Sequence, residues 1–254
     1  MTVRATVLAT VLAVLAVLAV LAVLAAYGRA EGFDEFPPMR AYVVSMPGTR
    51  SRSAVRARFA EQSQTITFVD GVDGTTLPVH PRLTPGQTGC AASHMRLWKE
   101  RLNDAGDAGD ASDAGDASGA SDDVLIFEDD AVLAPDFQSR LMRVRREIRG
   151  RDVDVVFVGH CFETEGGVWE GSKTLRTSVR PLCTHGYLVT ARGGVKLAGW
   201  AARGQVNDPI DVELAAMCKS GDLACLSCYP PLAATTEETS IVNTLTNPPR
   251  GTSV

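Results

Sequence analysis

The sequence predicts an α/β fold in which a central sheet is flanked by helices. Apolar, strand-like runs alternate with amphipathic, helix-like segments, and the first three follow the order strand, helix, strand. A second observation is the run from Val124 to Phe127, which is apolar throughout. Such a run is typical of a strand that is buried on both faces of a parallel or mixed sheet.

Composition and motifs exclude several classes of protein. The chain has 254 residues, a hydrophobic fraction of 45% and a net charge of −5, which suit one domain with a buried core and no nucleic-acid surface. The sequence contains no Walker A loop, Gly-x-Gly-x-x-Gly, Gly-x-Ser-x-Gly or His-Glu-x-x-His. We therefore expect neither an NTPase, a nicotinamide enzyme, a serine hydrolase nor a zinc protease.

An N-terminal membrane segment is predicted. Residues 5–26 are almost entirely Ala, Val and Leu, and a helix of this length spans the ~30 Å core of a bilayer. We interpret residues 1–30 as an uncleaved signal anchor, with a cleaved signal peptide as the alternative, and residues 31–39 as a stem. Both predict that the remainder enters the secretory lumen. The expected protein is a single-pass type II membrane protein of the ER or Golgi, secreted if the segment is cleaved.

The elements before residue 103 are justified by strand and helix signals. Thr84 and Pro85 form a helix start, with Thr84 as cap and Pro85 in the first turn. The predicted elements are a strand at residues 40–46, a helix at 51–62, a strand at 65–69 and a helix from 84 to about 102.

Residues 103–123 are a low-complexity run of Asp, Ala, Gly and Ser with no apolar residue larger than Ala. Such a segment cannot bury a core, so it predicts a solvated loop inside one domain. A calcium-binding repeat is the alternative, although the nonapeptide period of such repeats is missing.

Strands and helices alternate again after the loop. The predicted elements are a strand at residues 124–130, a helix at 135–149, strands at 153–158 and 186–190, helices at 193–202 and 208–221, and a strand at 223–229. We place the main domain at residues 40–232 and an extended tail at 233–254.

The six cysteines predict disulfides in a lumenal protein. The expected pairs are Cys161 with Cys183, and Cys218 with either Cys225 or Cys228. Cys225 and Cys228 also have the spacing of a redox or zinc motif, but no second pair of metal ligands accompanies them.

Three acids, Glu128, Asp129 and Asp130, directly follow the apolar run. Side chains alternate along a strand, so Glu128 and Asp130 share one face, and we expect Asp129 to anchor the strand end through hydrogen bonds on the other. Ligands of α/β sheets bind at the carboxyl ends of strands, where paired carboxylates hold hard divalent cations. A solvated acidic turn is the alternative.

Several segments together resemble glycosyltransferase family 25, which includes lipopolysaccharide and procollagen galactosyltransferases. The resemblance covers residues 40–232. The sequence departs from the family pattern in two places: Gly48 and Thr49 stand where basic residues are common, and the Asp-rich segment is an insert. The matching segments are Ser45, Pro47 and Arg52; residues 68–74; Gly89-Cys90-Ala91-Ala92-Ser93-His94 with Trp98; Leu125 to Asp130; Cys183 to Tyr187; and Pro209-Ile210-Asp211.

The resemblance implies a GT-A-like fold, a nucleotide-sugar donor and a divalent cation such as Mn²⁺. The expected reaction is inverting transfer of a hexose, galactose first among the candidates, from a UDP-sugar to a glycan or protein hydroxyl. A catalytically inactive, glycan-binding lumenal domain and a calcium-binding surface protein are the competing interpretations.

The resemblance also implies roles in binding the cation. We expect Asp130 to be the closest metal ligand, while Glu128 contacts the metal through water or binds the ribose. His185 either ligates the metal or orients the acidic loop.

Asp211 is the predicted catalytic base or donor-sugar ligand, and Asp208 is the predicted cap of its helix; capping by both residues is the alternative. Donor-binding residues are predicted to be Ser45, Arg52, Ser93, His94, Glu128 and Asp129. His94 is either a donor-site residue or a core histidine hydrogen-bonded to Ser93. Arg52 either contacts nucleotide phosphate or is one of several solvated arginines.

Overall fold

The computed structural model describes residue 36 and residues 39–102, 123–161 and 166–236. The chain divides into two compact units, Met1–Pro38 and Met39–Val254. The predictions for the N-terminal anchor, most of the stem, the Asp-rich loop and the end of the tail lie outside the described residues. Within the described ranges, no helix has both the length and the apolar character needed to cross a bilayer.

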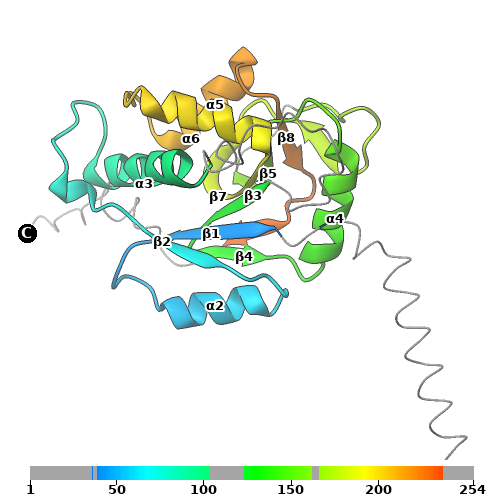
Figure 1. The fold of residues 1–254 in the computed structure, drawn as a ribbon, viewed down its shortest axis with the longest axis horizontal. Helices are drawn as coiled ribbons and strands as arrows, with labels where there is room; N and C mark the ends of the chain where they lie inside the picture. Colours follow the sequence, from blue (N-terminus) through cyan, green and yellow to red (C-terminus); the bar gives the residue numbers. More distant parts are fainter. Residues whose placement is uncertain (1–35, 37–38, 103–122, 162–165, 237–254) are drawn as a thin grey trace, which may run out of the picture. The chain divides into compact units, whose positions relative to one another are not determined.

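A seven-stranded mixed sheet forms the centre of the second unit, in the order β2-β1-β3-β7-β5-β8-β6 (Figure 1). β1 runs parallel to β2 and β3, whereas β7 lies antiparallel between β3 and β5. A second sheet pairs β4 with β9. The strands are β1 Arg40–Ser45, β2 Thr67–Asp70, β3 Val124–Glu128, β4 Ala131–Leu133, β5 Val155–Cys161, β6 Leu175–Thr177, β7 Leu182–Val189, β8 Cys225–Cys228 and β9 Ala233–Thr235.

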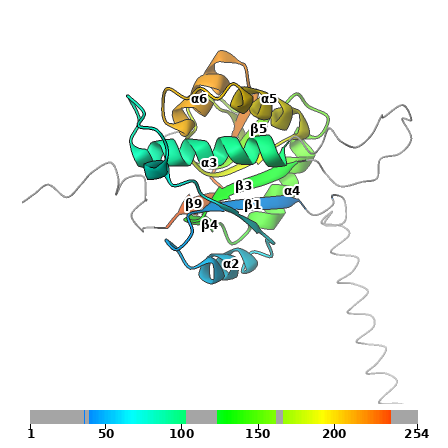
Figure 2. The ribbon, with the colours of Figure 1, turned by 60° about the vertical axis from the view of Figure 1, so that its left-hand side comes forward.

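Helices cover both faces of the sheet, which confirms the α/β prediction. α3, α5 and α6 lie over one face of the sheet, and α2 and α4 lie on the opposite face (Figures 1 and 2). The helices are α2 Arg52–Ala60, the 3₁₀ helix η1 Gly74–Thr76, α3 Pro85–Arg101, α4 Phe137–Ile148, α5 Ala191–Ala202 and α6 Ile210–Ser220.

The apolar run of β3 supplies both hydrophobic cores. Val124 and Ile126 belong to the core under α3, α5 and α6, whereas Leu125 and Phe127 belong to the core on the α2 and α4 side. All four side chains are at most 1% exposed. Because side chains alternate along a strand, Glu128 continues the row of Val124 and Ile126 and faces α3.

α3 begins where the sequence predicts. Thr84 and Gln87 form a reciprocal capping box, and Pro85 occupies the first turn. The helix approaches η1 closely, because a Cβ on Gly89 would lie 2.5 Å from the Val72 carbonyl oxygen. Glycine at this position therefore lets the loop before η1 lie directly against the helix.

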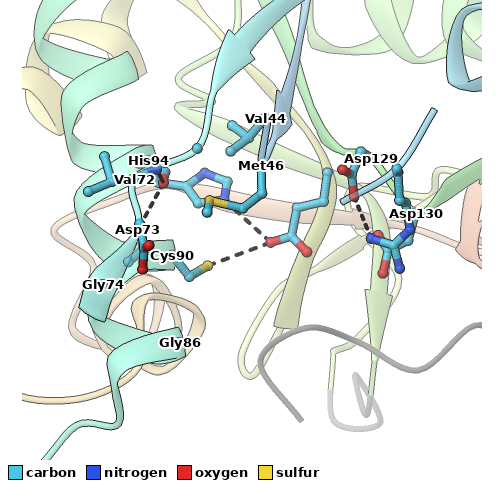
Figure 3. Close-up of a pocket in the computed structure, with 15 residues that line it drawn as sticks. Val44, Met46, Val72, Asp73, Gly74, Gly86, Cys90, His94, Asp129 and Asp130 are labelled. Atoms are coloured by element: carbon cyan, nitrogen blue, oxygen red, sulfur yellow. Dashed lines mark hydrogen bonds and ion pairs between the residues drawn. The ribbon is translucent and has the colours of Figure 1, made fainter. Parts of the chain in front are cut away.

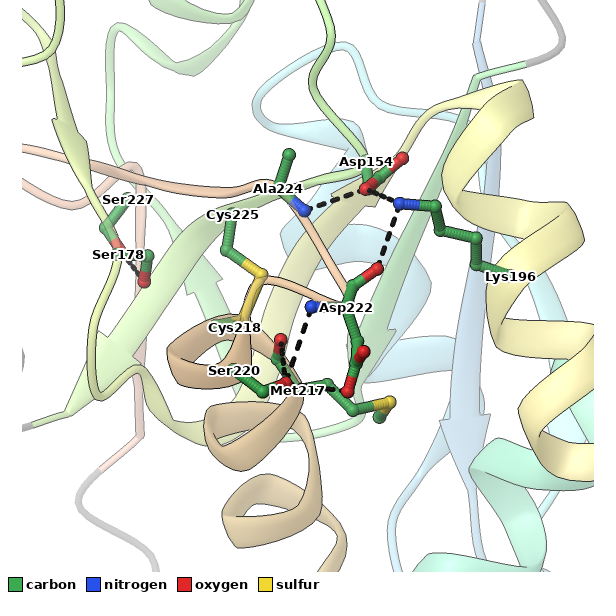
Figure 4. The surroundings of a disulfide bond; sticks show 10 residues. All are labelled: Asp154, Ser178, Lys196, Met217, Cys218, Ser220, Asp222, Ala224, Cys225 and Ser227. Carbon is green, nitrogen blue, oxygen red and sulfur yellow. Dashed lines mark hydrogen bonds and ion pairs between the residues drawn. A yellow bond between two sulfur atoms is a disulfide. The ribbon is translucent and has the colours of Figure 1, made fainter.

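A buried ionic cluster ties β5 to α5 and to the turn before β8 (Figure 4). Asp154 is 0% exposed, and its Oδ2 accepts hydrogen bonds from Lys196 Nζ at 2.6 Å and the Ala224 amide at 2.7 Å. Arg192 Nε lies 2.9 Å from the Asp154 Oδ1. Beside this cluster, Cys218 and Cys225 form a disulfide, which resolves the alternative partners of Cys218.

The structure corrects several predicted boundaries. β3 ends at Glu128 rather than at residue 130, and Asp129 and Asp130 form a turn. The strand predicted at residues 153–158 is β5 Val155–Cys161, whose end is extended by the pairing of Cys161 with Leu182 of β7. The short strands β4, β6 and β9 were not predicted. β9 lies in the segment that was predicted as an extended tail.

Candidate functional site

A pocket lies at the carboxyl ends of β1 and β3, beneath the N-terminal half of α3. In Figure 3, Cys90 and His94 project from α3, and Asp129 and Asp130 lie on the opposite side of the pocket. The predicted site residues Ser45, Arg52, His185 and Asp211 are not among its lining residues. The lining consists of Val44, Met46, Arg50, Gly71, Val72, Asp73, Gly74, Gly86, Gly89, Cys90, Ser93, His94, Glu128, Asp129 and Asp130.

Three donors converge on one oxygen of Glu128. Its Oε1 accepts hydrogen bonds from the Thr184 hydroxyl, His94 Nε2 at 3.4 Å and Cys90 Sγ at 3.8 Å. Burial tends to raise the pKa of Glu128, but the contacts with His94 and Thr184 bring the net pKa below its usual value. Glu128 is therefore an ionised carboxylate with one oxygen fixed by the protein and a side chain that is 29% exposed to the pocket.

A chain of buried hydrogen bonds orients His94. Its Nδ1 lies 2.7 Å from the Tyr187 hydroxyl oxygen, which accepts a hydrogen bond from Trp98 Nε1 at 2.9 Å. Because a carboxylate only accepts, Nε2 carries the hydrogen toward Glu128, and in a neutral ring Nδ1 accepts from Tyr187. The chain thus runs from Trp98 through Tyr187 and His94 to Glu128.

Ser93 does not bond His94, so that prediction was wrong. Its hydroxyl donates to the Gly89 carbonyl at 2.6 Å and accepts from the Val72 amide at 2.8 Å. Ser93 therefore fastens the loop before η1 to α3 and shapes one wall of the pocket.

Asp129 anchors the end of β3, as expected, although it also lines the pocket. Its Oδ2 accepts from Ser45 Oγ at 2.8 Å, and its Oδ1 accepts from Arg50 at 2.5 Å. Arg52 instead pairs with Asp70 and lies over the Phe68 ring. The arginine in the pocket is therefore Arg50 and not Arg52.

Asp130 is a buried carboxylate that lacks a full set of partners. It is 7% exposed, and its Oδ1 has no hydrogen-bond donor among the described residues. Burial, followed by the charge of Glu128, raises the pKa of Asp130 from 3.8 to about 6. Such an oxygen is suited to a cation, whose charge would replace the missing donors.

His185 is the second buried group without hydrogen-bond partners. Neither ring nitrogen has a partner at hydrogen-bond geometry within the described part of the chain. Burial lowers the pKa of the ring and outweighs the opposite effects of the Glu128 charge and the nearby Ala233 carbonyl, so the neutral form is favoured. Neutral imidazole is the form that ligates metals. A Cβ on Gly159 would lie 2.5 Å from the ring, so glycine at that position makes room for His185.

Asp211 lies in the first turn of α6 and fixes the backbone of β7. Its Oδ2 accepts from the Cys183 amide at 3.1 Å. Asp208 does not cap α6, contrary to prediction. Its carboxylate pairs with Arg82 at 2.8 Å, and Pro209 occupies the cap position without a side-chain hydrogen bond.

Two clusters within the described ranges bring three possible metal-ligating atoms within 4.8 Å of one another. One comprises Cys90, His94 and Glu128, and the other comprises Cys161, Cys183 and His185. The predicted ligand set of Glu128, Asp130 and His185 is not brought together at this spacing. Asp130 and Glu128 nevertheless line the same pocket, and the charge of Glu128 acts on the pKa values of both other residues.

The Tyr187→Phe substitution tests the hydrogen-bond chain. It leaves the buried Trp98 N–H without an acceptor and His94 Nδ1 without a donor, so we expect the free energy of unfolding to fall by about 2 kcal/mol. Urea denaturation measures this change. Tyr42→Phe is the matched control, because Tyr42 lies in the same core and its hydroxyl makes no hydrogen bond within the described residues. Equal effects in the two variants would contradict the chain.

The disulfide between Cys161 and Cys183 confirms a predicted pair and holds the residues beside the site. Cys183 has a φ of 70°, donates its amide to Asp211, and directly precedes Thr184 and His185. Removing the disulfide should lower the unfolding free energy by about 3 kcal/mol for a 22-residue separation, and should also release Thr184 from Glu128.

The double variant Cys161→Ser, Cys183→Ser tests this expectation against Cys218→Ser, Cys225→Ser. Both should be less stable in urea, but only the first should weaken binding of the divalent cation that is proposed below, measured by calorimetry. A first variant that binds cations as tightly as the control would refute the positioning role.

The sequence interpretation missed Arg50, Cys90, Thr184 and Tyr187 as site residues. Cys90, Thr184 and Tyr187 stand in segments that resemble the family, but nothing local distinguishes them from residues of the structural core. Burial, and then the charges of Glu128 and Asp211, raise the pKa of the Cys90 thiol, so its sulfur retains the proton that it donates to Glu128.

Comparison with known proteins identifies the family. A solved structure, "Crystal Structure of A197 from STIV", is 11% identical, with a TM-score of 0.41 over 80% of this chain and 87% of that chain. The model of glycosyltransferase family 25 (LPS biosynthesis protein) matches residues 39–212, which include the strands, the helix and the acids that form the pocket. The chain belongs to glycosyltransferase family 25.

Proposed function

We propose that the protein transfers a hexose, galactose first among the candidates, from a UDP-sugar to a hydroxyl of a glycan or protein, with inversion. Family membership supports glycosyl transfer in general. The observation that carries the proposal is the buried Asp130, whose Oδ1 lacks a donor beside the ionised Glu128 in the pocket. This pocket lies at the carboxyl ends of β1 and β3, where ligands of α/β sheets bind.

Asp130 and Glu128 would hold a divalent cation, for which we propose Mn²⁺, with His185 as a ligand or as the residue that orients the acidic turn. Carboxylate oxygens and a neutral imidazole are donor types that such an ion accepts, and Asp130 and Glu128 line one pocket, whereas His185 lies outside its lining. When bound, the cation supplies positive charge that neutralises the departing diphosphate. Asp129, held by Ser45 and Arg50, fixes the turn that carries Asp130.

Asp211 is the proposed base. The acceptor oxygen attacks the anomeric carbon as its hydroxyl proton passes to the carboxylate, and the bond from that carbon to the diphosphate oxygen breaks. The Cys183 amide holds Asp211 Oδ2, and the charge of Asp211 acts on the pKa of Cys90 in the pocket wall. These contacts support a carboxylate that is held in place beside the donor site.

We also propose that the domain resides in the lumen of the secretory pathway, anchored by the apolar segment at residues 5–26. The two disulfides support this location, because such bonds persist in oxidising compartments. Protection of the domain from added protease in sealed microsomes is the expected result, and digestion of the domain without detergent would refute the location.

A donor screen tests the proposed activity. The purified protein should hydrolyse at least one UDP-hexose in the presence of Mn²⁺, and the Asp130→Ala variant should not. Absence of hydrolysis with every donor, or hydrolysis unaffected by Asp130→Ala, would favour the alternative of an inactive glycan-binding domain. Deleting residues 103–123 distinguishes a transferase from a calcium-binding surface protein, because a transferase should remain active without this segment and a calcium-binding protein should lose its function.

Cation binding should depend on pH. The pKa of Asp130 is raised to about 6 in the cation-free protein, so the proton competes with the cation below that pH. The apparent affinity for Mn²⁺ should be highest above pH 6 and should fall by about tenfold per unit well below it. Calorimetric titrations between about pH 5 and 7 measure this dependence, and an affinity that is constant over this range would contradict it.

A further inference from the structure

Cys90 and His94 form a pair of potential metal ligands on one face of α3. They are four residues apart, so their side chains lie on adjacent turns of the helix. The same spacing presents two ligands to one ion in helical zinc sites. Glu128 approaches this pair from the end of β3, and ligand atoms of the three residues lie within 4.8 Å of one another.

The surroundings of His94 match those of a metal-binding histidine. Zinc-binding imidazoles donate their second ring N–H to a neighbouring acceptor, which fixes the orientation of the ring. The Tyr187 hydroxyl oxygen lies 2.7 Å from Nδ1. It can accept that hydrogen when Nε2 binds an ion, once its own O–H, which donates to Nδ1 in the ion-free protein, has turned away. His94 is 0% exposed as a whole, yet it borders the pocket through which an ion would enter.

The second cluster of similar composition cannot bind an ion in this way. Cys161 and Cys183 are joined in a disulfide, so their sulfurs are not available as thiolates. Cys90 is a free cysteine that lines the pocket, and Cys228 is a free cysteine buried elsewhere, in the core on the α2 and α4 side.

We propose that Cys90, His94 and Glu128 form a second cation site, which takes Zn²⁺ or an ion of similar softness. Sulfur, imidazole nitrogen and one carboxylate oxygen are a typical donor set for zinc with a fourth position open. On binding, the thiol proton of Cys90 leaves to solvent and the hydrogen of His94 moves from Nε2 to Nδ1. The balance is one ion bound and one proton released.

Occupation of this site has a consequence that rests on the proposed function. Glu128 belongs both to the soft-ion site and to the proposed site for the cation that accompanies the donor diphosphate. An ion held by Cys90, His94 and Glu128 therefore occupies the Glu128 oxygen that already faces α3, and this carboxylate is then no longer free to serve the cation at Asp130. Zn²⁺ is an inhibitor of the transferase under this proposal, and an excess of Mn²⁺ does not displace it from the thiolate.

Cobalt titration of the purified, metal-free protein with its disulfides intact tests the site directly. Co²⁺ is a spectroscopic substitute for Zn²⁺, and a Co²⁺–thiolate bond gives a near-ultraviolet charge-transfer band. We expect this band in the wild type and in Cys228→Ser, and expect Zn²⁺ to remove it. Cys90→Ser should lack the band, and Glu128→Gln should bind Co²⁺ at least tenfold more weakly. Circular dichroism establishes that each variant is folded.

Absence of the band in the wild type at excess Co²⁺ overturns the site, as does a band that persists in Cys90→Ser. A band that is lost only in Cys228→Ser would show that Cys228, and not Cys90, supplies the sulfur ligand, and this result also overturns the proposed site. Because this measurement uses neither donor nor acceptor, its failure leaves the transferase proposal intact. Conversely, a protein without transferase activity still reports on the soft-ion site.

Discussion

Asp130→Asn should abolish most activity and at the same time stabilise the cation-free protein. We expect Mn²⁺-dependent turnover of the donor to fall by about 10²–10³-fold, because the substitution removes the charge proposed to hold the cation. The unfolding free energy at pH 7 should rise by about 2 kcal/mol. Because the pKa of Asp130 is raised from 3.8 to about 6, ionisation of this carboxyl destabilises the folded state as the pH rises from the lower value to the higher one. The full penalty is present at pH 7, and asparagine removes it.

The neighbouring substitution Asp129→Asn is the matched control for stability. Asp129 is similarly buried, but its two oxygens accept from Ser45 and Arg50. Removing its charge should lower the unfolding free energy by about 2 kcal/mol, the opposite sign to Asp130→Asn. Urea denaturation of both variants without divalent cations, together with donor turnover, measures these effects. Destabilisation of equal size in both would show that Asp130 is structural.

Asp154→Ala should cause the largest loss of stability, about 3–5 kcal/mol. Asp154 is fully buried, and removing it leaves the Ala224 amide without an acceptor and the Lys196 ammonium with the Asp222 carbonyl but no carboxylate. The affected contacts join β5, α5 and the turn before β8, so the damage extends over one edge of the sheet. The free energy of unfolding from urea denaturation is the appropriate measurement.

Asp152→Ala is the control for Asp154→Ala. Asp152 also pairs with Arg192, but its side chain is 95% exposed, so water screens the pair and replaces it. We expect essentially unchanged stability for this variant. A similar loss in the two variants would mean that Arg192, rather than burial of Asp154, determines the effect.

Sequence patterns predicted the elements whose signals are local. The start of α3 depends on Thr84, Pro85 and Gln87, which act within one turn, and the structure confirms it. The buried strand β3 was evident from four consecutive apolar residues, and alternation correctly directed Glu128 toward one face. The predicted pair Cys161–Cys183 also formed.

Partners that come from distant parts of the chain were harder to predict. Ser93 bonds Val72 and Gly89 instead of its neighbour His94, because the close approach of η1 to α3 brings the Val72 amide within reach. Tyr187 is 93 positions from His94 in sequence and reaches it because β7 pairs with β3 in the sheet that α3 covers. The Asp208 carboxylate pairs with Arg82 instead of capping α6. These hydrogen-bond and ion-pair partners depend on which segments lie close together in the fold, and the local spacing of residues does not predict that.

The pairing of β4 with β9 has a consequence for synthesis of the protein. The Thr236 amide bonds the carbonyl of Asp130 at 2.9 Å, and β9 pairs with the strand that directly follows this residue. The turn that carries Asp130 therefore lacks its last support until residues 233–236 have left the ribosome, beyond the end of the family match at residue 212. A chain truncated after Cys228 would contain every predicted site residue and still lack the strand that braces Asp130.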